Sequence, residues 1–155
     1  MVYNPRTSAV YWRSGRATLV DNETGALEAC EFFERSACRL VISNNSVIPK
    51  APLVSSARLA YGGEFDWKKV PAIQDGFASS SAVAGYGDAP GMKAMAIHFA
   101  GTAYTATAKT TQAEAENAAL DACSRANPSG EGGACFIYAS GNKVVLNERR
   151  TKAAQ

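Results

Sequence analysis

The stretch TQAEAENAALDACSRANPSGEGGACFIYASGNKVVLN, residues 111–147, decides the fold that we expect for this chain. Small apolar side chains recur at helical spacing up to Cys123, and Pro128 ends the pattern because proline cannot continue a helix. Thr111 and Glu114 form a capping box at the start of this helix, since each side chain can satisfy a backbone donor beside the other. We therefore predict a capped helix that buries a narrow, alanine-rich face.

A loop flanked by two cysteines follows the helix, and the second cysteine opens a predicted β-hairpin. The same plan occurs near the N-terminus. ALEAC at residues 26–30 aligns with ALDAC at 119–123, and the alignment continues without a gap to the start of the chain. ACRLV at 37–41 then aligns with ACFIY at 134–138 after a four-residue insertion in the second loop. Similarity across helix, cysteine and hairpin indicates an internal duplication.

The predicted fold class is α+β, with two tandem β-β-α-β-β repeats, antiparallel sheets, one helix per repeat and disulfide staples. We divide the chain into a first repeat, a connector and a second repeat within one compact pseudo-symmetric domain, with boundaries at residues 1–50, 51–92 and 93–150. Within the connector we expect a strand or short helix over 53–61 and a strand over 77–86. The second repeat begins with a hairpin around Gly101. Whether the two repeats pair edge to edge or pack about a pseudo-two-fold axis stays open.

Four cysteines allow three disulfide pairings. Cys30 and Cys38 flank one helix-to-strand loop, and Cys123 and Cys135 flank the equivalent loop, so we predict that each pair forms a disulfide. Free buried thiols are the alternative. A metal site is not expected, because the chain has no Cys-x-x-Cys spacing and a single histidine. Disulfides favour a periplasmic or secreted protein. The first residues, MVYNPRTS, lack the features of a signal peptide, so we interpret the chain as a mature fragment.

The charge pattern does not favour nucleic acid as a partner. The net charge is +2, and no basic run is interleaved with aromatic residues. The ERRTK segment at 148–152 is interpreted as a solvated tail. No apolar run reaches the roughly 20 residues of a membrane span. We predict no cofactor, because no glycine-rich phosphate loop with a following GKS or GKT is present.

The sequence also lacks a recognisable catalytic constellation, so we predict that the protein is not an enzyme. His98 lies on a predicted strand, and the ungapped alignment places Pro5 at its position in the first repeat, which excludes a role common to both repeats. Ser79, Ser80 and Ser81 lack a G-x-S-x-G setting. Glu31 and Glu34 share a helical face, where carboxylates are usually solvated. We interpret His98 as structural.

Binding is the better interpretation. Aromatic residues concentrate in the connector segment 59–69, LAYGGEFDWKK, and large amphipathic rings are favoured at interfaces. The candidate binding residues there are Tyr61, Phe65, Asp66 and Trp67. The alternative is that Phe65 and Trp67 alternate inward and fill the junction between the repeats. Trp12, beside Tyr11 and near two arginines, marks a second and weaker candidate surface, whose alternative is a strand with one buried face.

Helices of the form A-E-A-x-x-A-A-L-x-A-C, followed by a strand that begins with cysteine, resemble the exported bacterial domains of unknown function 4189. The matching residues are 113–123 and 135–146, and a weaker copy covers 25–48 with Gly25 as a departure from the pattern. The resemblance implies an exported bacterial protein with helix-to-strand disulfides. It brings no catalytic residues, because the family has no assigned chemistry.

Three functions from different classes are consistent with these observations. The first is a small exported protein-binding module, such as an inhibitor or immunity protein against a secreted hydrolase. The second is a cell-envelope domain that binds glycan or peptidoglycan, which requires exposed, coplanar rings at Tyr61 and Trp67. The third is a hydrolase with an unrecognised site, which requires His98 to be accessible to solvent and close to a carboxylate. We favour the first, with another protein as the partner.

Overall fold

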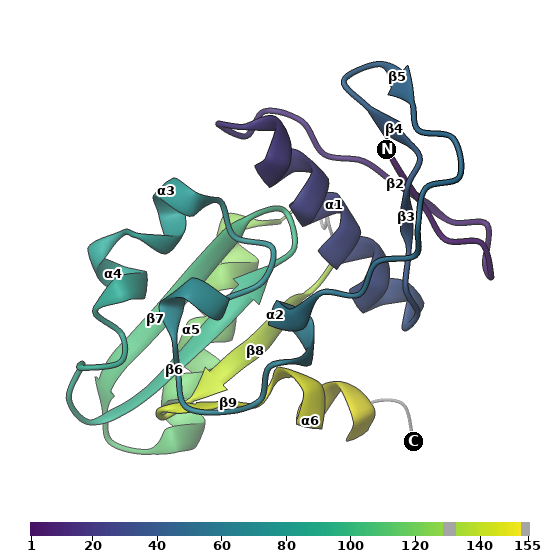
Figure 1. Ribbon diagram of the computed structural model, residues 1–155. Coiled ribbons are helices and arrows are strands. Elements are labelled where there is room, and N and C mark those ends of the chain that lie inside the picture. The colour runs from purple at the N-terminus through teal and green to yellow at the C-terminus, as the bar shows by residue number, and fades with distance from the viewer. Residues whose placement is uncertain (129–132, 153–155) are drawn as a thin grey trace. The chain divides into compact units, whose positions relative to one another are not determined.

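The computed structural model describes residues 1–128 and 133–152, and the chain divides into two compact units, Met1–Leu59 and Ala60–Gln155 (Figure 1). We call these the N-terminal and C-terminal units. The predicted connector, residues 51–92, spans this division. Each unit combines a long helix with antiparallel strands and one disulfide, which confirms a mixed fold of helices and antiparallel sheets.

The N-terminal unit contains a three-stranded antiparallel sheet and a separate hairpin. The sheet has the order β2-β1-β3, formed by β1 (Val2–Tyr3), β2 (Val10–Tyr11) and β3 (Arg39–Leu40). The hairpin pairs β4 (Ile42–Ser43) with β5 (Ser46–Val47). Its two turn residues, Asn44 and Asn45, have φ angles of 44° and 65°. Asparagine tolerates this left-handed region, as the two central positions of a type I′ turn require.

Helix α1 (Leu19–Glu34) packs on β1, β2 and β3. It begins after Thr18, whose hydroxyl accepts the N–H of Asp21 at 3.0 Å. Its inner face buries Ala26 and Cys30 against Val2. The small inner side chains let the helix lie close to this short sheet.

The C-terminal unit is built on a four-stranded antiparallel sheet of order β7-β6-β8-β9. The strands are β6 (Met92–His98), β7 (Thr102–Lys109), β8 (Cys135–Ser140) and β9 (Lys143–Val144). The predicted hairpin around Gly101 is thus confirmed as β6 and β7. Helix α5 (Gln112–Ala126) lies across one face of the sheet and contacts β6, β7 and β8 (Figure 1). The contact is made mainly by alanines, Ala94, Ala96, Ala106, Ala115 and Ala119, which allow close approach.

The cap of α5 follows the predicted box with one difference. The Thr111 hydroxyl accepts the Glu114 N–H at 3.2 Å, but the Glu114 carboxylate accepts the N–H of Thr110 rather than that of Thr111. At the other end, the Asn127 side-chain amide donates to the carbonyl of Cys123 at 2.8 Å. This contact satisfies a terminal carbonyl, so the helix ends before Pro128.

Short helices form most of the remaining structure. They are α2 (Ala57–Ala60), the 3₁₀ helix η1 (Trp67–Lys69), α3 (Asp75–Ala78), α4 (Ser81–Ala84) and α6 (Leu146–Lys152). The strand expected over 77–86 is therefore wrong: Ser80 occupies the N-cap position of α4 and Gly85 ends the helix, and the serine and alanine side chains carry no alternating pattern that would hold a strand. The ERRTK segment is part of α6 rather than a solvated tail.

Two disulfides join Cys30 to Cys38 and Cys123 to Cys135, which confirms the predicted pairing. Each joins the last turns of a long helix to the start of the strand that follows. Disulfides indicate an oxidising, extracellular-type environment. Within the described parts of the chain, no helix is both long and apolar enough to cross a membrane.

Candidate functional site

The edge strand β2 is anchored through Tyr11, whose side chain points inward. The Tyr11 ring stacks on Phe33 at 6.3 Å between centroids, and its hydroxyl donates to the Glu34 carboxylate at 2.6 Å. Thr7 donates to the other oxygen of that carboxylate at 2.5 Å. These two hydroxyls hold the pKa of Glu34 below its usual range, the Thr7 contact being the larger cause. Glu34 therefore has a structural role, which fixes the β1–β2 loop and the edge strand against α1.

Anchoring Tyr11 inward turns the residues on either side of it outward, because side chains alternate along an extended chain. Trp12 is 68% exposed and Val10 is also exposed. The described residues include ten exposed large apolar side chains, and eight of them belong to the N-terminal unit: Met1, Val10, Trp12, Leu19, Val20, Val47, Leu53 and Val54. Contiguous exposed apolar surface marks interaction sites, and this unit holds most of the exposed apolar side chains from which such a surface could form.

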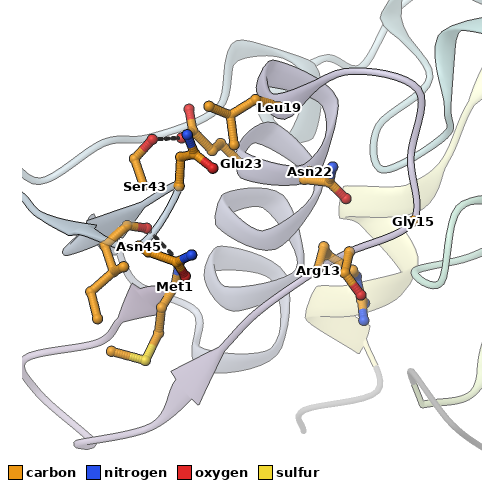
Figure 2. Close-up of a pocket in the computed structure, with 11 residues that line it drawn as sticks. Met1, Arg13, Gly15, Leu19, Asn22, Glu23, Ser43 and Asn45 are labelled. Carbon is orange, nitrogen blue, oxygen red and sulfur yellow. Dashed lines mark hydrogen bonds between the residues drawn. The ribbon is translucent and has the colours of Figure 1, made fainter.

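A pocket of about 330 Å³ lies in this same unit (Figure 2). It is lined by the Arg13–Gly15 segment, the first turns of α1, and the β4–β5 hairpin with its turn. Arg13 follows Trp12 directly, and Leu19 precedes Val20, so two pocket-lining residues are neighbours of exposed apolar side chains. The volume is at the lower end of the range for small-molecule sites. The pocket therefore suits one side chain or one small polar group.

Glu23 and Ser43 supply the main polar pair of this pocket. The Ser43 hydroxyl donates a short hydrogen bond to Oε1 of Glu23, joining α1 to β4. In Figure 2, Glu23 is turned toward Ser43, whereas Arg13 lies beyond Asn22, away from Glu23. Asn22 makes hydrogen bonds to nearby backbone groups: its side chain accepts the N–H of Arg16 and donates to the carbonyl of Thr18. The pocket thus presents one carboxylate that Arg13 does not neutralise at close range.

The aromatic segment predicted from sequence folds into a compact local structure. The Tyr61 hydroxyl donates to the carbonyl of Glu64 at 2.6 Å, and the Lys69 ammonium lies 4.1 Å from the Tyr61 ring centroid. Lys68 lies 5.5 Å from the centroid of Trp67. Asp66 caps η1 by accepting the Lys68 N–H at 3.0 Å. The structure therefore groups Tyr61, Asp66 and Trp67 around two lysines.

Phe65 differs from its neighbours because its ring packs within the C-terminal unit. It makes edge contacts with Tyr86 and Tyr138 at centroid distances of 4.6 Å and 6.3 Å. Tyr86 is buried and donates to the carbonyl of Gly141, and burial raises the pKa of its phenol. Phe65 thus belongs to the packing of this unit.

His98 is buried, with 1% of its surface exposed. Its Nε2 lies 3.0 Å from the carbonyl oxygen of Gly133, and its Nδ1 accepts the N–H of Ala100 at 3.3 Å. Both ring nitrogens are therefore engaged by backbone groups, and no carboxylate of the described residues hydrogen-bonds either of them. Within the two described ranges, 1–128 and 133–152, no group of three or more metal-ligating side chains is present.

Asn4, rather than Pro5, is the counterpart of His98 by strand register, which corrects the ungapped alignment. Val2 pairs with both Tyr11 and Leu40, whereas Ala96 pairs with both Tyr104 and Ile137. Two residues after Val2 and Ala96 stand Asn4 and His98. The Asn4 side chain accepts the N–H of Arg6 and donates to Ser36, as the His98 ring contacts Ala100 and Gly133. Both side chains thus join a hairpin turn to the residue two positions before a disulfide cysteine.

Comparison with known proteins gives no relative: no family model, no curated protein and no solved structure matches this chain. The candidate site consequently depends on geometry alone. The Glu23–Ser43 pair was missed by sequence reasoning, although the internal alignment contains the signal. Glu23 aligns with Glu116 and Ser43 with Ser140, so two polar positions repeat on either side of a helix-to-hairpin contact.

Proposed function

We propose that the protein is a small exported binding module whose partner is another protein. The observation that carries this proposal is the concentration of exposed apolar side chains in the N-terminal unit, led by Trp12. Tryptophan and arginine are the residues most often found at the energetic centre of protein interfaces, and Arg13 lies next to Trp12 at the rim of the pocket. The binding surface proposed here is therefore the Trp12 surface, defined as Val10, Trp12, Leu19 and Val20 with the adjoining pocket.

The same proposal includes a duplicated fold, in which each unit is one copy of a β-β-α-β-β element. Two observations support it. The sheet orders β2-β1-β3 and β7-β6-β8 place equivalent strands in the same spatial order. Each long helix is joined by a disulfide to the strand after it. The Asn4 and His98 contacts agree with this correspondence. The copies then differ most in their exposed surfaces, which favours binding by one unit.

We infer export and the class of partner from the two disulfides and from the resemblance to an exported family. Two disulfides suit the periplasm or the exterior, and the likeness to exported bacterial domains of unknown function 4189 points in the same direction. An inhibitor or immunity protein against a secreted hydrolase is the class we favour. Such proteins need a stable surface rather than a catalytic group.

The two other functions have less support. Glycan binding at Tyr61 and Trp67 needs free ring faces, but a lysine ammonium lies over each ring. A hydrolase using His98 needs an accessible imidazole next to a carboxylate, and the His98 nitrogens instead contact backbone atoms of Gly133 and Ala100. We therefore place binding at the Trp12 surface ahead of both.

A capture experiment tests the proposal. The oxidised protein is immobilised and exposed to envelope extract and culture supernatant of the source organism. Baits carrying Trp12→Ala and Trp67→Ala are run in parallel, because both remove a tryptophan but only one alters the Trp12 surface. We expect one protein to be retained near stoichiometrically by the wild type and by Trp67→Ala, and to be lost with Trp12→Ala. Retention that depends on Trp67 instead, or retention of cell-wall fragments, would contradict it.

A further inference from the structure

In the C-terminal unit, a serine–glutamate pair binds the guanidinium of an arginine. The Ser140 hydroxyl at the end of β8 donates to Oε1 of Glu116 on α5 at 2.6 Å. The guanidinium of Arg149, on α6, then contacts both carboxylate oxygens, at 2.6 Å to Oε1 and 2.8 Å to Oε2. This bidentate contact is the geometry that guanidinium and carboxylate groups favour. Glu116 thus accepts from one hydroxyl and one arginine, and a contact with Gln112 also helps to lower its pKa.

The N-terminal unit has the same pair without the arginine. Ser43 at the end of β4 donates to Oε1 of Glu23 on α1, just as Ser140 does to Glu116. Among the described residues, nothing hydrogen-bonds Oε2 of Glu23. After β5 this unit continues to Val54, which bridges to Cys38, so it has no helix in the chain position that α6 has after β9. Beside Glu23 lies the pocket instead.

We propose that this pocket receives the guanidinium of an arginine from the protein partner, which would contact Glu23 as Arg149 contacts Glu116. This inference rests on the proposed protein-binding function and gives the chemistry of the partner at that site. A guanidinium offers five N–H donors in a plane, of which two satisfy the carboxylate. Asn44 and Asn45 also line the pocket, are exposed, and make no side-chain hydrogen bond to described residues, so their side-chain carbonyls can accept from the remaining donors.

Two further features fit an arginine rather than a compact cation. Leu19 and Ile42 line the pocket, and they offer apolar contact to the aliphatic stem of a long side chain. Leu19 stands at the position that Gln112 has in α5, where the glutamine amide donates to the carbonyl of Lys93. The N-terminal unit thus has an apolar side chain where the C-terminal unit closes a local hydrogen bond, which leaves the carboxylate approachable.

The test uses the full oxidised chain, ¹⁵N-labelled, and N-acetyl-arginine amide as the probe, with N-acetyl-citrulline amide as a neutral control of the same shape. We expect saturable amide shifts around residues 13–23 and 42–45 with a dissociation constant on the order of 100 mM, as a single exposed ion pair allows. Citrulline amide is expected to bind about five-fold more weakly. Glu23→Gln keeps the acceptor for Ser43 and is expected to abolish the difference between the two probes.

Arg149→Ala provides the matched control, because it vacates the guanidinium position on Glu116. In this variant we expect new probe-dependent shifts at Glu116 and Ser140, which are silent in the wild type. A response at Glu116 in Arg149→Ala without one at Glu23 overturns the inference, as does equal binding of the two probes or no saturable shift at the pocket. Because no partner enters this titration, its failure leaves the capture result unaffected. A failed capture alongside a successful titration would instead contradict only the proposed function.

Discussion

The Nε2 atom of His98 lies 3.0 Å from the carbonyl oxygen of Gly133, two residues before the disulfide cysteine Cys135. A carbonyl oxygen only accepts, so Nε2 carries the proton, and Nδ1 is unprotonated because it accepts the Ala100 N–H. The imidazole therefore connects the β6–β7 turn to the residues just before Cys135. Asn4 makes the corresponding contacts in the N-terminal unit with an amide in place of the ring.

The first prediction concerns this connector. His98→Leu fills the volume but leaves Gly133 and Ala100 without their partners, so we expect a loss of about 1–3 kcal/mol in the free energy of unfolding. His98→Asn supplies the donor and acceptor that Asn4 supplies, and we expect it to recover part of that loss. Urea unfolding of the oxidised proteins measures both values. A leucine variant as stable as the wild type would show that the two contacts are dispensable.

Glu116 and Arg149 give a pH-dependent prediction. The Arg149 guanidinium holds the pKa of Glu116 below its usual range, an effect that exceeds the opposing effect of burial. Because the pKa is lower in the folded state, the ion pair contributes fully above the unfolded-state value of about 4.3 and is lost as pH falls through the folded-state value. We expect Arg149→Ala to cost about 1 kcal/mol or less at pH 6, since Arg149 is 43% exposed, and nothing at pH 2.

Urea unfolding of wild type and Arg149→Ala across pH 2–6 measures this difference. Lys143→Ala is the matched control, because the Lys143–Glu148 pair is more than half exposed on both sides and is expected to contribute little at any pH. Parallel stability profiles for wild type and Arg149→Ala would contradict the prediction.

Local signals explain what could be predicted from the sequence. The helix start at Thr111, the cysteine pairs and the Gly101 hairpin depend on residues a few positions apart, and all agree with the structure. The counterpart of His98 was misplaced because the β1–β2 loop is one residue longer than its equivalent. The strand pairs show this difference, because Val2 pairs with Tyr11 whereas Ala96 pairs with Tyr104. An ungapped alignment cannot show it.

Long-range contacts explain what could not be predicted. Ser43 and Glu23 are twenty residues apart and meet only because the β4–β5 hairpin comes back beside the first turns of α1. Likewise, nothing local in the sequence places Arg149 against Glu116, since their contact needs α6 to return to α5. Among the predicted binding residues, Trp12 and Trp67 are distinguished by exposure and by lysine contacts, which depend on tertiary structure.

The disulfides are expected to stabilise each unit separately. Cys30–Cys38 and Cys123–Cys135 close loops with sequence separations of 8 and 12, for which the chain-entropy model gives about 2–3 kcal/mol each. We expect the double serine variant at either pair to lose stability by this amount. Alkylation with and without reductant, followed by mass analysis, checks that all four thiols are protected in the native protein. Labelling of any cysteine before reduction would contradict the pairing.

The last prediction concerns Gly25, which interrupts an otherwise favourable helix. A Cβ atom at this position would overlap Nη1 of Arg16, whose guanidinium crosses α1 there and donates to the carbonyl of Asp21. Gly25→Ala gains about 1 kcal/mol of helix propensity but must displace that guanidinium. In the Arg16→Ala background the obstruction is gone, so we expect the same substitution to stabilise by up to about 1 kcal/mol, and to stabilise less, or to destabilise, in the wild type. Urea unfolding of the four proteins in this double-mutant cycle gives the coupling between the two sites. A coupling energy of zero would mean that Arg16 moves aside freely and that the glycine is not needed for its position.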